Sequence, residues 1–135
     1  MCLITEQKRV KILRKDLTVY KRFYDGGVLR PWSLSYRDKF VYTVGVVHKQ
    51  PLCVNNIYGG HHDLLAQNAY HSARYENFTN VHDGFHSALK LKRLGVCQHY
   101  YIDYVCVIPK GSKVFKDKTG LIVSNQIILK EKICV

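Results

Sequence analysis

Histidines gather in the second half of the chain, where they suggest metal binding or acid–base chemistry. Six of the seven histidines fall between residues 61 and 99: His61, His62, His71, His82, His86 and His99. Zinc would accept such ligands, but the chain contains no CxxC pair and no HExxH sequence. Gly84 also disfavours the helix that would place His82 and His86 on one face. We therefore expect no tightly bound metal, and histidines with ordinary polar or capping roles.

Carboxylate and nucleophile chemistry have less support. The chain has ten acidic residues, and none of them forms the close pair that a glycosidase needs. Asp103 interrupts an apolar run, so we expect it on a solvent-facing side of a strand, the alternative being a basic partner. There is no GxSxG elbow, Walker loop or GxGxxG sequence. The residues therefore assign no catalytic group and no cofactor.

Basic and aromatic residues are interleaved between residues 20 and 42, a pattern typical of nucleotide or nucleic-acid recognition. Aromatic faces can stack on a base while nearby cations pair with phosphates. The aromatic members are Tyr20, Tyr24, Trp32, Tyr36, Phe40 and Tyr42. The net charge of +11 attracts polyanions and phosphorylated ligands, although it also keeps a small protein in solution. The aromatic and basic surface between residues 20 and 42 is therefore expected to bind an anionic ligand.

The stretch from residue 79 to 112 organises the elements that position these groups. Asp83-Gly84 marks a turn, after which His86 or Ser87 is expected to cap a short helix that ends at Gly95. A strand over Tyr101–Ile108 follows, because aromatic and β-branched residues dominate it. The turn, the helix and the strand would together frame a site.

Three further strands are expected, over Leu17–Phe23, Phe40–Val47 and Ile122–Leu129, the last broken near Ser124-Asn125. Alternation places Tyr20 and Arg22 opposite the apolar face of the first strand. Residues 49–80, with a helix over 63–74, are interpreted as an inserted loop or lid. We predict one α+β domain over residues 1–135, with a small mixed or antiparallel sheet and one or two short helices.

The cysteines and the N-terminus bear on the compartment. Five cysteines without a CxxC pair favour a reducing environment and no disulfide framework. No apolar run is long enough for a signal peptide or a membrane span. We therefore expect a cytoplasmic protein without a membrane partner.

The order of motifs resembles the split-sheet core of ADP-ribosyltransferase-like domains. The resemblance rests on Tyr20-Lys21-Arg22, on the sequence GFHSA at residues 84–88, and on strands near 105–108 and 122–129. In that family the first strand offers a His or Arg to a nicotinamide dinucleotide, and a later strand carries the catalytic glutamate. Here the last strand has no glutamate, and the nearest one is Glu131. The resemblance implies that fold and a nucleotide-like ligand that is bound without turnover.

The chain also resembles small bacteriophage proteins that begin with Met-Cys-Leu and carry GFHS and IPKGS. Phage proteins often sequester the nucleotide signals of host defence, so this resemblance implies a counter-defence or accessory role in the cytoplasm of a host cell. We expect an anionic, nucleotide-like ligand to contact five residues: Tyr20, Arg22, His86, Ser87 and Lys110. Its phosphate would lie on the N–H groups that open the Ser87 helix.

Two alternatives stay open at this point. The first is an ADP-ribosyltransferase-like or nucleotide-cleaving enzyme in which His86 acts as the acid or base. The second is a nucleic-acid or host-protein binding module whose basic surface acts without a pocket. For the leading interpretation, removal of Arg22 or His86 is expected to weaken binding and to leave stability nearly unchanged.

Overall fold

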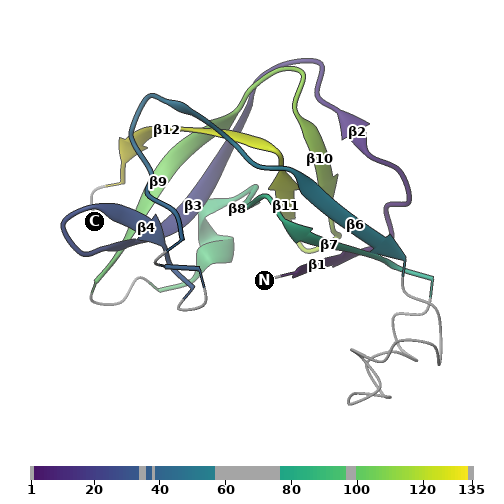
Figure 1. The fold of residues 1–135 in the computed structure, drawn as a ribbon, viewed down its shortest axis with the longest axis horizontal. Helices are drawn as coiled ribbons and strands as arrows, with labels where there is room; N and C mark the ends of the chain where they lie inside the picture. The colour runs from purple at the N-terminus through teal and green to yellow at the C-terminus, as the bar shows by residue number, and fades with distance from the viewer. Residues whose placement is uncertain (1, 34–35, 38, 57–76, 97–99, 134–135) are drawn as a thin grey trace, which may run out of the picture.

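The computed structural model describes residues 2–33, 36–37, 39–56, 77–96 and 100–133, which form two β-sheets with antiparallel strand pairs (Figure 1). The smaller sheet has the order β1-β7-β6, and the larger has the order β2-β10-β11-β8-β3-β9-β12-β5, with β4 beside β3. The elements are β1 Cys2–Thr5, β2 Lys11–Ile12, β3 Leu17–Asp25, β4 Leu29–Pro31, β5 Val47–Lys49, β6 Leu52–Asn56, β7 Thr79–Asp83, β8 Phe85–Ala88, the 3-10 helix η1 Leu91–Leu94, β9 Tyr101–Ile108, β10 Lys113–Lys116, β11 Leu121–Ser124 and β12 Gln126–Lys132.

Strand β3 lies at the centre of the larger sheet. It pairs with β9 from Leu17 to Tyr24, with β8 at Tyr20 and with β4 at its far end. Its side chains alternate, as a strand requires, and Val19 and Phe23 are fully buried. Phe23 packs edge-on against the rings of Tyr42 and Tyr104. The main hydrophobic cluster therefore lies on this face of β3.

Asp83 and Gly84 carry the chain from the smaller sheet into the larger one, between β7 and β8 (Figure 1). Both have positive φ angles, of 58° and 72°. A Cβ atom on Gly84 would clash with the Leu52 side chain and lie 2.8 Å from the Ser124 carbonyl oxygen, so only glycine fits. The predicted break at Asp83-Gly84 is confirmed, but it joins two sheets and no α-helix follows it.

The α+β prediction is wrong, because the described residues are almost entirely β-sheet. The helix expected from Ser87 to Gly95 is replaced by strand β8 and the single 3-10 turn η1, which does end at Gly95. Strand β8 pairs with β11 through Ser87 and Ile122, and Phe85 and Ala88 are fully buried. This long-range pairing outweighs the helical spacing of the apolar residues.

The strands expected over Leu17–Phe23 and Tyr101–Ile108 are confirmed as β3 and β9. The one expected over Ile122–Leu129 is β11 and β12, divided at Asn125 as predicted. The strand expected over Phe40–Val47 is wrong. That stretch makes only single bridges, at Tyr42 and Val44, before β5 begins at Val47. Gly45 has a φ of 82°, outside the extended region, so the regular strand is interrupted there.

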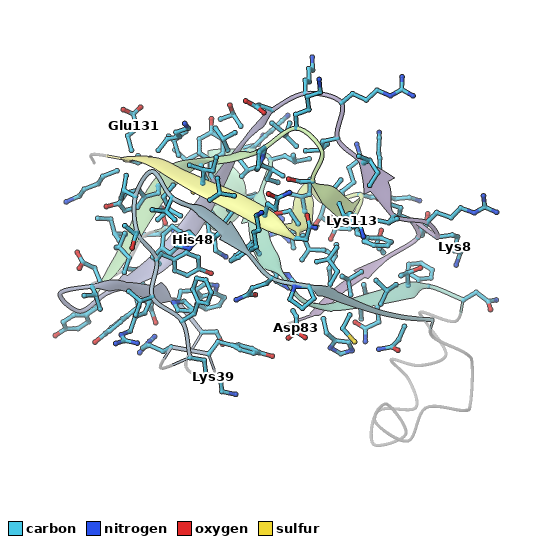
Figure 2. The ribbon with its side chains drawn as sticks, turned by 45° about the horizontal axis from the view of Figure 1, so that its top comes forward. Lys8, Lys39, His48, Asp83, Lys113 and Glu131 are labelled. Atoms are coloured by element: carbon cyan, nitrogen blue, oxygen red, sulfur yellow. The ribbon has the colours of Figure 1, made fainter. Side chains whose placement is uncertain are left out.

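The segment 49–80, interpreted from the sequence as a lid, supplies strand β6 and the start of strand β7, which pair with each other. The helix expected over 63–74 lies outside the described residues. Figure 2 shows Lys39 over a different part of the ribbon from Lys8 and Lys113. Within the described ranges, no helix has the length and apolar character that a membrane crossing requires.

Candidate functional site

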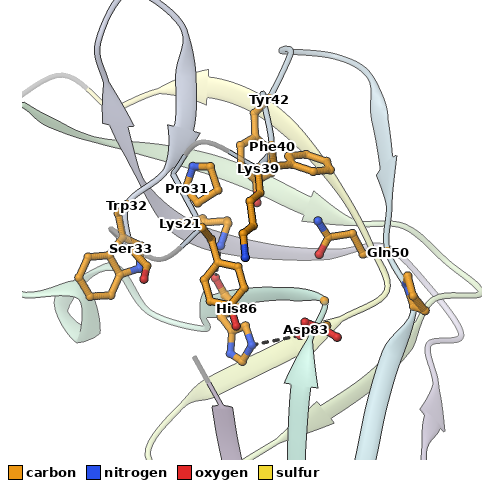
Figure 3. Close-up of a pocket in the computed structure, with 13 residues that line it drawn as sticks. Lys21, Pro31, Trp32, Ser33, Lys39, Phe40, Tyr42, Gln50, Asp83 and His86 are labelled. Atoms are coloured by element: carbon orange, nitrogen blue, oxygen red, sulfur yellow. Dashed lines mark hydrogen bonds between the residues drawn. The ribbon is translucent and has the colours of Figure 1, made fainter.

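A cavity of about 390 Å³ lies beside the central strand, between the chain that follows β4 and the Asp83–His86 turn (Figure 3). We call it the Lys21 cavity. Its aromatic wall consists of Trp32, Tyr36, Phe40 and Tyr42, and its polar lining includes Lys21, Lys39, Gln50, Asp83 and His86. Aromatic walls with a few convergent polar groups are typical of small-molecule sites.

Lys21 reaches this cavity from the buried face of β3. It lies on the same face of the strand as Val19 and Phe23, and only 6% of the residue is exposed. Its Nζ donates a 2.6 Å hydrogen bond to the backbone carbonyl oxygen of His86. Figure 3 shows Lys21 and Lys39 pointing into the same space. In the described part of the chain, no carboxylate forms an ion pair with Lys21, so a buried ammonium lacks its usual compensation.

Burial lowers the pKa of Lys21 from 10.5 to about 8, because desolvation disfavours the ammonium form. The neighbouring Cys106 opposes this shift, which burial dominates. Burial raises the pKa of the Cys106 thiol to about 12, so the thiol is neutral at pH 7 and does not balance the lysine charge. At pH 7, roughly one Lys21 amine in ten is therefore neutral.

His86 stands on β8 at the edge of the same cavity. Its Nε2 lies 3.1 Å from the carbonyl oxygen of Asp83. A carbonyl only accepts, so Nε2 carries the proton and Nδ1 keeps its lone pair. Burial first, and then the positive charge of Lys21, lower the pKa of His86 from 6.5 to about 3. His86 is therefore a neutral imidazole at pH 7, held in place by the Asp83-Gly84 kink.

A second cavity, of about 460 Å³, shares Trp32 and His86 with the first and also includes Arg22, Ser87 and Arg93 in its lining. Its other lining residues are apolar: Leu3, Leu94, Val96, Tyr101 and Leu121. Ser87 is 4% exposed, and among the described residues its hydroxyl has no hydrogen-bond partner. Its charged lining residues are two arginines, whereas the lining of the Lys21 cavity has two lysines and one carboxylate.

Arg22 acts as a structural clamp at this second cavity. Its Nε and Nη2 donate to the two carboxylate oxygens of Asp103, at 2.8 and 3.0 Å. Its Nη1 and Nη2 also donate to the backbone carbonyls that follow η1, at Leu94, Gly95 and Val96. The guanidinium therefore holds the end of η1 against β9. Asp103 does not face solvent as expected, since the structure shows the alternative, a basic partner.

The structure separates the five residues predicted as ligand contacts. Arg22, His86 and Ser87 line the second cavity, and His86 lines both cavities. Tyr20 lines neither, although it lies on β3. Lys110 is exposed in the turn after β9, where its backbone N–H donates to Asp16. The phosphate site proposed for the start of a Ser87 helix is wrong, because no helix begins there.

Sequence reasoning missed Lys21 and Lys39 as site residues. The signal for Lys21 lay in the alternation of β3, because Lys21 is in phase with Val19 and Phe23, which were placed on the buried face. A lysine in that phase must either reach a cavity or bury its charge at a cost. For Lys39 there was no signal, since its placement follows from the path of the chain after β4.

The remaining histidines and cysteines do not extend the site. His61, His62, His71 and His99 lie outside the described residues. Among the residues that are described, no three His, Cys, Asp or Glu side chains gather as metal ligands would. Cys106 is a buried thiol, as expected from its apolar strand.

The site therefore consists of two adjoining cavities that share His86 and Trp32, with a buried amine in the first. We infer what the site can bind from the chemistry of these lining residues. Comparison with protein-family models, with curated proteins and with solved structures finds no match to the chain.

Proposed function

We propose that this protein binds a small, anionic, nucleotide-like ligand in the Lys21 cavity and does not turn it over. Its role would be that of a phage-type counter-defence or accessory protein in the cytoplasm. The observation that carries the proposal is an aromatic cavity into which two lysines project, Lys21 and Lys39, against one carboxylate, Asp83. Such a lining attracts a ligand with both a flat ring and a negative charge.

The aromatic wall supports a ring-containing ligand. Trp32 and Tyr36 remain 41% and 36% exposed, so their faces are available for stacking. Stacking of one base on an aromatic side chain contributes about 1–3 kcal/mol. The Nζ of Lys39 lies over the Tyr36 ring, 5.5 Å from its centroid, so the cation covers one face of this ring close to Trp32 in the lining of the cavity. A ring and an attached phosphate would therefore meet complementary groups a short distance apart.

The polar groups favour binding over catalysis. His86 was the candidate acid or base of the enzyme alternative, but a pKa of about 3 makes it a poor base and leaves it no proton to donate from Nδ1 at pH 7. The last strand β12 extends to Lys132 and so does contain a glutamate, Glu131, contrary to the expectation from the sequence, but this side chain is exposed and lines neither cavity. Four basic side chains, Arg9, Lys11, Lys116 and Lys118, line a separate open hollow that has no aromatic residue among its described lining residues, so a ligand with a flat ring is better matched by the Lys21 cavity.

The proposal is tested by calorimetric titration with nucleoside mono-, di- and triphosphates at low salt. We expect Lys39→Ala and Trp32→Ala each to weaken binding about tenfold, the loss expected when a charge-assisted contact or a stacked ring is removed. Lys110→Ala is the matched control, since it removes an equally basic residue outside both cavities. Equal weakening by Lys110→Ala would place the ligand elsewhere.

The absence of turnover is tested separately. Mass spectrometry of the small molecules released on denaturing the purified protein is expected to give the bound nucleotide intact. A cleaved or transferred product would favour the enzyme alternative. No binding by any nucleotide would overturn the proposal.

A further inference from the structure

We propose that Lys21 is a nucleophilic amine that forms an imine with a small anionic aldehyde entering the Lys21 cavity. This activity is covalent, and it depends on Lys21 whether or not nucleotides are ligands. It follows from four features of the cavity: a primary amine at its lining, the absence of a described ion pair, a second cation nearby and aromatic walls.

Imine formation requires an amine that is held in place with its lone pair available, and the position of Lys21 meets this requirement. Lys21 extends from a central strand whose neighbours pair on both sides, so its backbone is fixed. A single 2.6 Å hydrogen bond to the His86 carbonyl oxygen orients Nζ. A neutral amine has two N–H bonds and one lone pair. The hydrogen bond uses one N–H, which leaves the lone pair for attack on a carbonyl carbon.

The protonation state meets the second requirement, because only the neutral amine attacks a carbonyl. Burial lowers the pKa of Lys21 to about 8, and desolvated lysines are the usual source of Schiff-base amines in proteins. At pH 7, an amine with this pKa is neutral roughly 300 times more often than one with the ordinary pKa of 10.5. Lys39 lines the same cavity and supplies a second positive charge for an anionic substituent of the aldehyde.

The reaction balances without an added oxidant or reductant. The Nζ lone pair forms a bond to the aldehyde carbon, and the C=O π electrons move to oxygen. The nitrogen releases one proton and the oxygen takes one up, which gives a carbinolamine. Loss of the hydroxyl with a second proton, as water, then forms the C=N bond. The products are one imine and one water molecule, and the linkage is reversible by hydrolysis.

The rest of the cavity defines the aldehyde. Lys39 suits an anionic substituent such as a phosphate, and Trp32 and Tyr36 suit a flat ring. Pyridoxal 5′-phosphate carries an aldehyde, an aromatic ring and a phosphate, so it is an appropriate probe. Pyridoxal has the same aldehyde and ring without the phosphate, and it is the matched control for the role of Lys39.

The test uses the full chain, pyridoxal 5′-phosphate and borohydride, which reduces an imine to a stable amine that peptide mass spectrometry locates. We expect labelling at Lys21 to be at least tenfold faster than at the exposed Lys110 and Lys113, and slower with pyridoxal. Lys21→Met and Lys21→Arg should remove this label while leaving the surface labels unchanged. The mapping on the parent protein needs no variant, so it decides the matter even where a variant fails to fold.

Two outcomes would overturn the inference: label spread evenly over exposed lysines, or label at Lys21 no faster than at Lys110. The result is distinguishable from that of the nucleotide titration. Nucleotide binding without a Lys21 adduct would refute the imine and leave the proposed function standing. A Lys21 adduct without nucleotide binding would support the imine and refute the proposed function.

Discussion

Lys21 gives the sharpest prediction about stability, because the structure buries its amine without a described ion pair. The pKa of Lys21 falls from 10.5 in the unfolded chain to about 8 in the folded protein. Each pKa unit corresponds to about 1.4 kcal/mol, so the charged amine destabilises the folded state by about 3 kcal/mol below pH 8. Between pH 8 and 10.5 the unfolded state binds more protons than the folded state. The free energy of unfolding therefore gains a contribution that rises with pH across this window.

The substitution Lys21→Met removes that charge and keeps a flexible apolar chain of similar length in the core. It also removes the hydrogen bond to the His86 carbonyl oxygen, which contributes about 1 kcal/mol. Because the desolvation cost is larger than the hydrogen bond, we expect Lys21→Met to be about 2 kcal/mol more stable than the parent at pH 6.5. Near pH 10.5 the folded lysine is neutral and the unfolded one is half protonated, so almost all of the desolvation cost is gone and the variant should be equal to the parent or slightly less stable.

Urea unfolding at several pH values, followed by the fluorescence of the single tryptophan, measures this difference. Lys110→Met is the matched control, and its difference from the parent should not change with pH, because Lys110 is exposed. Other groups that titrate near pH 10 cancel in the comparison of variant with parent. A Lys21→Met protein that is less stable at pH 6.5, or a difference that is constant with pH, would show that the charge of Lys21 is compensated.

Three further predictions concern the frame of the site. Arg22→Ala should destabilise the protein by about 3 kcal/mol, contrary to the expectation from the sequence, because Asp103 and three backbone carbonyls lose their hydrogen-bond donor. A double-mutant cycle of Arg22 and Asp103 in urea unfolding measures their interaction energy, and additive losses would contradict the clamp. Because the pKa of His86 is lowered, the folded state binds fewer protons than the unfolded state between pH 3 and 6.5, and the contribution of His86 to the free energy of unfolding should fall by about 2 kcal/mol from pH 6.5 to 5. His86→Gln should remove this pH dependence when stability is measured at several pH values. Gly84→Ala should lower the free energy of unfolding by at least 2 kcal/mol more than Gly111→Ala, because both positions have positive φ but only the Cβ added at Gly84 would clash. Equal losses of stability in thermal or urea unfolding would refute the steric argument.

The strands that could be predicted are those whose local pattern agrees with their pairing. Leu17–Phe23 and Tyr101–Ile108 have strong β propensity and pair with each other in the sheet. The region after Gly84 could not be predicted, because the spacing of Ala88, Leu91 and Leu94 fits either a helix or a strand followed by a turn. The choice depends on β11, which lies far away in the sequence, and propensity does not contain that information.

The place of the cavity could not be predicted from the sequence. The interleaved aromatic and basic residues predicted an aromatic–basic surface, and three of them, Trp32, Tyr36 and Phe40, line the Lys21 cavity. The cation that reaches the cavity from the central strand is Lys21, whereas Arg22 was chosen because it faces away from the apolar side. Which face of β3 meets a cavity depends on the packing of the chain after β4, and alternation alone does not reveal that.

The junction at Asp83-Gly84 has a mechanical consequence. The cluster of Leu3, Val81, Phe115 and Val123 packs the smaller sheet against β10 and β11 of the larger one, and β7 passes directly into β8 through this tight link. Relative movement of the sheets must therefore distort the kink, and both kink residues line the Lys21 cavity. A molecule that fills the cavity would brace the joint and slow the opening of both sheets together. Amide hydrogen exchange should then decrease in parallel for β1, which touches no part of the cavity, and for β8, which borders it.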